Sequence, residues 1–154
     1  MKTIAVIGAG LMGSGIAQKI AQEGMEVILC DVSTQSLERG MGMIKKFLEE
    51  GVQRRIFSPD QAKAIEGRIR PTPRVEDAAA AELVVEAVFE DLKVKQELFQ
   101  KLDAVCLPST VLASNTSSLL VNDLAKALKY PERFGGLHYL YHPAKNRLVE
   151  IIPG

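Results

Sequence analysis

The sequence begins with Lys2-Thr-Ile-Ala-Val-Ile-Gly-Ala-Gly-Leu-Met-Gly-Ser-Gly15, a stretch that predicts a strand, a glycine-rich turn and the start of a helix. Residues 3–7 are mostly apolar and β-branched, as in a strand buried on both faces. Gly8, Gly10 and Gly13 follow with the spacing G-x-G-x-x-G. The first glycine permits a tight turn, the second lets the backbone approach a pyrophosphate, and the third lets helix and strand pack closely. The stretch therefore predicts a dinucleotide-binding unit.

The position of Asp31 supports this interpretation. It ends the next predicted strand, residues 27–31, about 20 residues after the glycines, which is the spacing of the dinucleotide fingerprint. A carboxylate there would accept hydrogen bonds from the adenosine ribose and repel a 2′-phosphate, so the sequence favours NAD over NADP. The first helix would point free N–H groups at the phosphates. The alternative is a tight turn that binds no ligand, with Asp31 capping the next helix.

The composition excludes several classes of protein. The 154 residues suffice for one domain with one core, and 47% hydrophobic and 25% charged residues are ordinary for a soluble globular protein. A formal net charge of zero, no Trp and 5% aromatic residues argue against nucleic-acid binding. No apolar run approaches the length of a membrane span, and residues 1–3 lead directly into the first strand. We therefore expect no membrane partner and no targeting peptide.

The two cysteines and the absence of metal motifs suggest a reducing compartment and no metal site. Cys30 and Cys106 lie in apolar or helical settings, where buried thiols are expected rather than a disulfide. The chain has neither H-E-x-x-H nor paired C-x-x-C. We expect a cytoplasmic protein.

Strand and helix patterns alternate along the chain, which predicts an α/β fold of the Rossmann type: a doubly wound, mostly parallel sheet in a single domain, residues 1–154. A basic helical excursion, residues 51–67, follows the second βα unit, and Ser58-Pro59 should begin a short helix there. Helices are also expected over 13–23, after a Ser33 cap and after an Asp91 cap. The remaining predicted strands are 68–71, 82–87, 110–114, 133–138 and 148–152.

Ligands bind outside the carboxyl ends of the strands in an open parallel sheet. Polar groups follow five of the predicted strands, so they should meet at one edge. They are Gly8 to Gly13, Asp31, Glu90, Asn115 with Ser117, and His138.

His138 is the candidate general base. Glu150 lies in the apolar run 148–152, where a buried carboxylate needs a partner, and a His–carboxylate pair is a common way to orient a base. The alternative is a surface salt bridge from Glu150 to Lys145 or Arg147.

Ser117 lacks a local signature of its own. It or Ser118 could be a helix cap. The chain has no G-x-S-x-G, which argues against serine-hydrolase chemistry.

Four ordered motifs now suggest a family: Val6 to Gly13, Val84 to Lys95, Ala113 to Leu119, and Gly136-Leu-His with Leu148 to Ile152. Together they resemble the NAD-binding domain of the 3-hydroxyacyl-CoA dehydrogenases, among which the 3-hydroxybutyryl-CoA dehydrogenases are nearest in appearance. The resemblance covers nearly the full chain. It implies reversible, NAD-dependent oxidation of (S)-3-hydroxyacyl-CoA to 3-oxoacyl-CoA, with acetoacetyl-CoA among the substrates.

The resemblance also implies roles for individual residues. His138 would be the catalytic base, Glu150 its orienting carboxylate and Ser117 the hydrogen-bond partner of the substrate oxygen. Arg54 and Arg55 lie where the family meets the CoA phosphates. The residues implied in NAD binding are Gly8, Ala9, Gly10, Leu11, Met12, Gly13 and Asp31 for the adenosine half, and Glu90, Lys95, Asn115 and Ser117 for the nicotinamide ribose half.

The sequence departs from the family in two ways. The family has His, two aromatics, Asn and Pro in succession, whereas this chain has His138-Tyr-Leu-Tyr-His-Pro143, so we expect a different loop with His142 as a loop residue. The family also has a helical second domain that supplies dimer contacts, most of the acyl pocket and a catalytic Asn, and Gly154 is where that domain would begin. This chain is thus expected to be the cofactor-binding half, inactive alone, of a homodimeric enzyme.

Two other functions are compatible with the same motifs. One is a dinucleotide-binding module without turnover, used for sensing or structure. The other is a related β-hydroxyacid dehydrogenase that acts on free acids. Such enzymes rely on a catalytic lysine in the second domain, and the motifs at 115–118 and at His138 and Glu150 argue against this choice.

Overall fold

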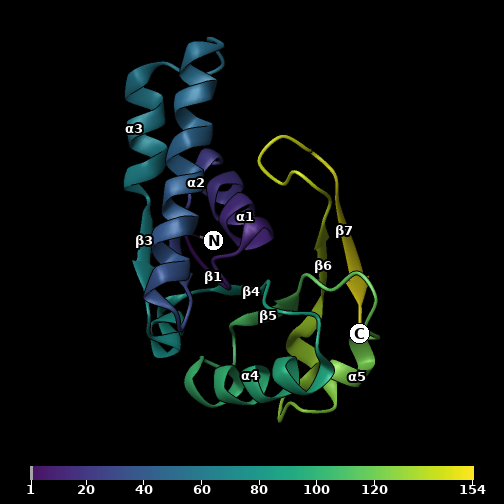
Figure 1. Cartoon of the computed structure of the whole chain (residues 1–154). Coiled ribbons are helices and arrows are strands. Elements are labelled where there is room, and N and C mark those ends of the chain that lie inside the picture. The colour runs from purple at the N-terminus through teal and green to yellow at the C-terminus, as the bar shows by residue number, and fades with distance from the viewer. Residues whose placement is uncertain (1) are drawn as a thin grey trace.

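Six parallel strands and one antiparallel strand form a single sheet in the computed structural model, which describes residues 2–154 (Figure 1). The order across the sheet is β3-β2-β1-β4-β5-β6-β7, with only β7 antiparallel to its neighbour. The strands are β1 (Thr3–Ile7), β2 (Glu26–Cys30), β3 (Ile69–Thr72), β4 (Leu83–Glu86), β5 (Val111–Ser114), β6 (Phe134–Tyr139) and β7 (Val149–Pro153).

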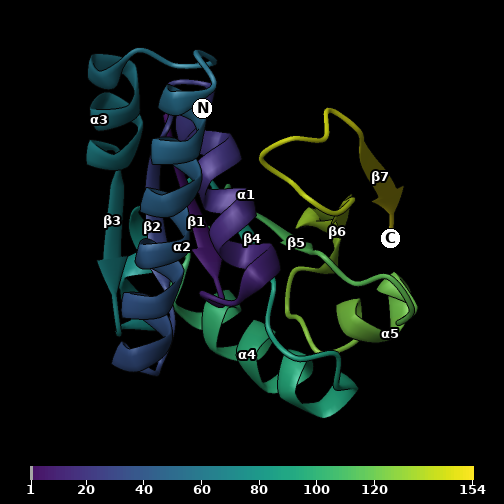
Figure 2. The same ribbon diagram turned by 45° about the horizontal axis from the view of Figure 1, so that its top comes forward.

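Helices cover both faces of this sheet, with α1, α2 and α3 on one side and α4 and α5 on the other (Figure 2). The helices are α1 (Leu11–Gln22), α2 (Thr34–Gln53), α3 (Pro59–Gly67), α4 (Leu92–Val105) and α5 (Val121–Ala125), with short 3-10 helices η1 (Val75–Ala80) and η2 (Pro131–Arg133). This is the predicted doubly wound Rossmann-type architecture.

Alternation along β1 divides the core into two parts. Ile4 and Val6 pack with residues of α1 and α2 on one face of the sheet. Ala5 and Ile7 point to the other face, where they pack with residues of α4 and α5. All four side chains are at most 4% exposed, so β1 is buried on both faces, as its apolar sequence predicted.

Both α2 and α3 begin with the expected capping groups. Ser33 caps α2 by accepting a hydrogen bond from the N–H of Ser36. Ser58 and Gln61 form a capping box at the start of α3, with Pro59 in its first turn. The two helices pack against each other beside α1 (Figures 1 and 2).

The chain order across the sheet fixes where a ligand can bind. β1 lies between β2 and β4, so the connections leave β1 and β4 in opposite directions and open a crevice at their carboxyl ends. The glycine-rich turn follows β1 into this crevice. Among residues 2–154, none of the helices has both the length and the apolar character required to cross a bilayer.

The predicted elements differ from the observed ones mainly in their ends. β3 is the weak strand expected near 68–71, shifted by one residue, and β4, β5 and β6 each start one residue later than predicted. The 3-10 helices and α5 were not predicted, because elements of three to six residues lack the periodicity that identifies a helix.

Candidate active site

The glycine-rich turn has the shape that a diphosphate requires. A Cβ on Gly8, whose φ is 105°, would lie 2.5 Å from the carbonyl oxygen of Ala87, and one on Gly13 would lie 1.7 Å from that of Gly8. Both glycines are therefore required by the turn itself. A Cβ on Gly10 would meet nothing within 4 Å, so open space lies above the loop at this point. The residues present therefore fit a bound dinucleotide.

The amino end of α1 faces the same space. Its N-cap is Gly10, which has no side chain to satisfy the first helical N–H groups, and its first turn, from Leu11 to Gly13, contains no acidic residue. Ala9, also part of the loop, is 2% exposed, whereas Leu11 is exposed. This twelve-residue helix thus presents unpaired N–H groups to a ligand at the loop.

Asp31 joins the glycine-rich turn to the start of α2. Its Oδ2 accepts a hydrogen bond from the N–H of Ala9 and its Oδ1 one from the N–H of Ser33, both at 2.9 Å. Ser33 rather than Asp31 caps α2, so the helix-cap alternative for Asp31 is wrong. The carboxylate lies half-buried beside the glycine turn, at the ends of two neighbouring strands.

His138 and Glu150 lie side by side on β6 and β7. They are direct partners in the antiparallel register, and Nδ1 of His138 is 2.8 Å from Oε2 of Glu150. Their side chains are 21% and 54% exposed, so the imidazole remains accessible. Within residues 2–154, Glu150 forms no ion pair with Lys145 or Arg147, so the surface salt bridge is wrong. The pairing through Nδ1 orients the imidazole ring of His138.

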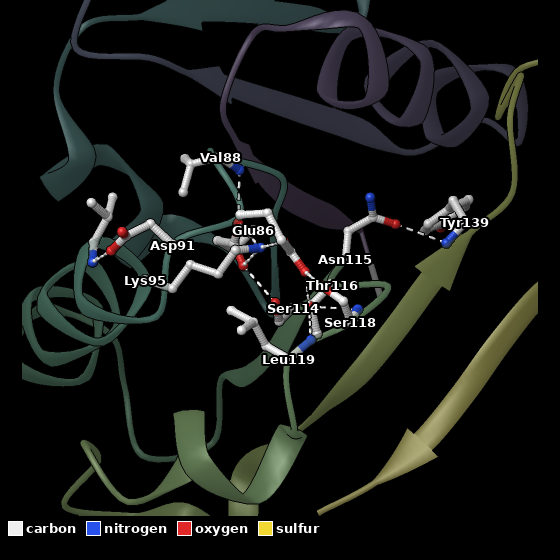
Figure 3. Close-up of polar contacts among 12 residues, drawn as sticks. Glu86, Val88, Asp91, Lys95, Ser114, Asn115, Thr116, Ser118, Leu119 and Tyr139 are labelled. Carbon is white, nitrogen blue, oxygen red and sulfur yellow. Dashed lines mark hydrogen bonds and ion pairs between the residues drawn. The ribbon is translucent and has the colours of Figure 1, made fainter.

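Asn115 connects the end of β5 to β6 next to His138. Its backbone N–H donates to the carbonyl oxygen of Glu86, and its side-chain Oδ1 accepts from the N–H of Tyr139 at 2.8 Å (Figure 3). The amide nitrogen of Asn115 is thereby oriented while its donors remain available. Asn115 and His138 thus belong to the same sheet edge.

Ser117 lies in the turn that follows Asn115. It is exposed, and within the described part of the chain its hydroxyl has no hydrogen-bond partner. The N-cap of α5 is Leu120, without a side-chain cap, so the helix-cap alternative for Ser117 and Ser118 is wrong. The hydroxyl of Ser117 is free to meet a ligand.

Lys95 lies beside Glu86 in Figure 3 and also pairs with Glu90. Nζ of Lys95 lies 2.7 Å from Oε2 of Glu90 and 2.9 Å from Oε1 of Glu86, and Lys95 is 1% exposed. Partial burial tends to raise the pKa of Glu90, but hydrogen bonds from Lys95, Thr116 and Ser118 lower it to about 2. Glu90 is therefore ionised and faces the sheet edge, with Lys95 behind it.

Glu86 was missed by the reasoning from sequence. It is the last residue of β4 and is fully buried. Its position in an apolar strand could have identified it, because a buried carboxylate needs a partner, and Glu150 was singled out for the same reason.

A basic cavity of about 360 Å³ lies between α1, α2 and the loop that joins β6 to β7. Arg54 lines it, whereas Arg55 does not and has a left-handed backbone with φ 58°. Four cationic side chains and one carboxylate are among its walls: Lys19, Arg54, Lys145, Arg147 and Glu50. Sequence reasoning did not connect Lys19, Lys145 and Arg147 with Arg54, because only the fold brings them together.

His142 attaches the loop between β6 and β7 to α2. It is 7% exposed, its ring packs edge-to-face on Phe47 at 4.2 Å between centroids, and its Nδ1 accepts from the N–H of Ala144. Burial and the charge of Lys145 both lower the pKa of His142. His142 is a loop residue, as expected, and its packing against Phe47 was not predicted.

The comparisons with known proteins agree with this geometry. Residues 3–154 match the family described as 3-hydroxyacyl-CoA dehydrogenase, NAD binding domain. The chain is 38% identical over 154 residues to a probable 3-hydroxybutyryl-CoA dehydrogenase of Bacillus subtilis, of which it covers 54%. It is 39% identical over 154 residues to the 3-hydroxyadipyl-CoA dehydrogenase of Escherichia coli, of which it covers 32%. The chain thus spans about half or less of the length of these relatives.

A solved structure has the same fold over the full chain. The (S)-3-hydroxybutyryl-CoA dehydrogenase from Ralstonia eutropha superimposes with a TM-score of 0.97 at 28% identity, over 100% of this chain and 54% of that one. The resemblance found in the motifs is therefore confirmed. The chain belongs to the 3-hydroxyacyl-CoA dehydrogenase family, of which it carries the NAD-binding domain.

Proposed function

We propose that the whole protein is an NAD-dependent dehydrogenase that interconverts (S)-3-hydroxyacyl-CoA and 3-oxoacyl-CoA, and that this chain is its cofactor-binding half. The observation that carries the proposal is the hydrogen-bonded pair of His138 and Glu150 at the same sheet edge as the glycine-rich turn. A dinucleotide-binding module without turnover would have no use for an oriented imidazole there.

The cofactor would be held by residues that follow four strands, β1, β2, β4 and β5. The N–H groups at the start of α1 would bind the pyrophosphate, and Asp31 would accept from the adenosine ribose. Glu90 and Asn115 would bind the nicotinamide ribose half, with Ser117 beside them. NAD bound in this way supplies a hydride acceptor for C3 of the hydroxyacyl group.

The proton is handled by this chain's own residues. Nε2 of His138 would take the proton of the substrate hydroxyl, while Glu150 holds the opposite ring nitrogen and stabilises the imidazolium. The free hydroxyl of Ser117 would hydrogen-bond the substrate oxygen and hold it during the transfer.

The CoA moiety would occupy the basic cavity. Arg54, at the C-cap of α2, and Lys145 and Arg147, in the loop between β6 and β7, would offer positive charge to the phosphates. Arg55 is proposed only as an outer contact, because it does not line the cavity.

The protein's setting follows from the same proposal. We place it in the cytoplasm, because both Cys30 and Cys106 are buried free thiols. The whole protein would form a homodimer through a helical domain that also supplies most of the acyl pocket.

The test is reduction of acetoacetyl-CoA by the whole protein, followed by the loss of NADH absorbance. We expect turnover with NADH, and a loss of about 10²–10⁴-fold in kcat for His138→Gln. The 154-residue chain alone should bind NAD but have little or no activity. NAD binding without any hydride transfer by the whole protein would favour the sensing module instead.

A further inference from the structure

Glu86 is the most deeply buried carboxylate next to the site. It is 0% exposed, and both of its oxygens are satisfied. Oε1 accepts from the N–H of Val88 at 2.7 Å, and Oε2 accepts from the hydroxyl of Ser114 at 2.6 Å and from Nζ of Lys95 at 3.1 Å. A buried charge is tolerated only when it is paired and hydrogen-bonded in this way.

The ammonium group of Lys95 is surrounded by carboxylate oxygens. An ammonium group has three N–H donors. Three carboxylate oxygens lie around Nζ: Oε1 of Glu86 at 2.9 Å, Oε2 of Glu86 at 3.1 Å and Oε2 of Glu90 at 2.7 Å. The side chain is also 1% exposed, so it lies buried between the two carboxylates.

Glu90 is hydrogen-bonded in turn to residues of the turn at 115–119. Its Oε1 accepts from the hydroxyls of Thr116 and Ser118. The Thr116 oxygen in turn accepts from the N–H groups of Ser118, at 3.4 Å, and of Leu119, at 3.0 Å. Thr116 and Ser118, on either side of Ser117, are therefore tied through Glu90 and Lys95 to the buried Glu86.

We propose that Glu86 and Lys95 are positioning residues, which hold Glu90 and the turn at 115–119 so that Asn115 and Ser117 face the cofactor and the substrate. The inference rests on the proposed function. It changes the role of Lys95, which acts through Glu90 rather than on NAD itself. Glu90 is the more exposed end of this network, because its side chain is 37% exposed and that of Glu86 is fully buried.

Helix α4, which carries Lys95, also supplies two control positions, Asp103 and Lys93. Asp103 pairs with Arg133 in a bridge whose side chains are each 6% exposed, and this bridge ties α4 to η2 without contact to the turn at 115–119. Asp103→Asn therefore breaks a buried ion pair outside the site. Lys93→Met removes an exposed lysine from the first turn of α4.

The experiment compares Lys95→Met and Glu86→Gln with these controls in the 154-residue chain. NMR titration of the side-chain carboxyl gives the pKa of Glu90, calorimetry gives the Kd for NAD, and thermal unfolding gives Tm. We expect Lys95→Met to return the pKa of Glu90 toward the ordinary range of a glutamate. NAD binding should weaken by about tenfold or more in both variants, the loss of one charge-assisted hydrogen bond.

The controls separate positioning from stability. Asp103→Asn should lower Tm as much as the network variants but leave the Kd for NAD within about twofold of the wild type. Equal effects of Asp103→Asn and Lys95→Met on Kd, or an unchanged pKa of Glu90 in a folded Lys95→Met chain, would overturn the proposal.

A milder pair of variants applies if loss of the buried charge prevents folding. Thr116→Val keeps the shape of the side chain but removes its hydroxyl, and Thr116→Ser restores the hydroxyl. The valine variant should raise the pKa of Glu90 and weaken NAD binding, and the serine variant should reverse both changes. If Thr116→Val and Thr116→Ser have the same pKa of Glu90 and the same Kd for NAD, the proposed role of this hydrogen-bond network is wrong. Failure of the proposed function is distinct, because it shows as absent NAD binding in the wild-type chain itself.

Discussion

His138 and Glu150 stand directly opposite each other in the antiparallel pair formed by β6 and β7, with Nδ1 and Oε2 2.8 Å apart. A short loop reverses the chain between β6 and β7, and this reversal brings the two residues together. Parallel strands need a longer crossover connection, so residues only 12 positions apart could not face each other in them. The loop between β6 and β7 also carries Lys145 and Arg147 to the basic cavity. The same loop thus links the proposed proton-transfer pair to the proposed CoA site.

The first prediction concerns this pair. In the whole protein, His138→Gln should lower kcat/KM by about 10²–10⁴-fold. Glu150→Gln should lose a large share of the same effect, because the two side chains act as one unit. The double variant should therefore be little worse than His138→Gln alone, which steady-state kinetics of acetoacetyl-CoA reduction would measure. If the losses of the two single variants add up in the double variant, the carboxylate is structural. Glu97→Gln, at an exposed position on α4, serves as the control.

The second prediction concerns cofactor choice. Wild-type chain should bind NAD(H) more tightly than NADP(H), because the carboxylate of Asp31 would repel a 2′-phosphate. Asp31→Asn removes the charge while keeping one oxygen acceptor for the N–H of Ala9 or of Ser33, so it should lower Tm slightly and narrow the difference between the cofactors. Calorimetric titration of the wild type and of Asp31→Asn with NAD(H) and with NADP(H) measures these affinities. Equal affinities in the wild type would contradict the role of Asp31.

The third prediction tests the basic cavity. Arg54→Gln and Arg147→Gln should each raise KM for acyl-CoA substrates several-fold and leave the Kd for NAD unchanged, since both side chains line the cavity beside α1 and α2. Arg55→Gln is the neighbouring comparison, and it should have a smaller effect because Arg55 lies outside the lining. A larger effect of Arg55→Gln would place the CoA phosphates outside the cavity.

The sequence predicted most of the fold, because its signals were local. Ser33, Ser58 and Asp91 cap the helices at which they were expected, since an N-cap is decided by residues within one turn. The candidate site residues were predicted to lie at one edge of the sheet, because ligands bind at the carboxyl ends of parallel strands. That prediction needed no knowledge of side-chain contacts.

The unpredicted parts of the site depend on packing between distant segments. Lys95 was expected beside the cofactor, but its helix packs so that the side chain is buried between Glu86 and Glu90. The hydrogen bond from Ser114 to Glu86 joins residues 28 positions apart. Helical periodicity identifies the buried face of α4, but it does not say which carboxylates that face will meet.

The last prediction concerns acid stability. The pKa of Glu90 is about 2 in the folded chain against an ordinary value of 4.5, because hydrogen bonds from Lys95, Thr116 and Ser118 outweigh its partial burial. A lowered folded-state pKa means that the ionised group stabilises the fold above the ordinary value and that this contribution is lost as the pH falls toward 2. Glu90→Gln should therefore be less stable than the wild type near neutral pH, and the difference should shrink below pH 4.5. Urea unfolding of both chains across this range measures it, with Glu97→Gln as the exposed control. A difference between wild type and Glu90→Gln that stays constant down to pH 2 would mean that the hydrogen bonds around Glu90 do not depend on its charge.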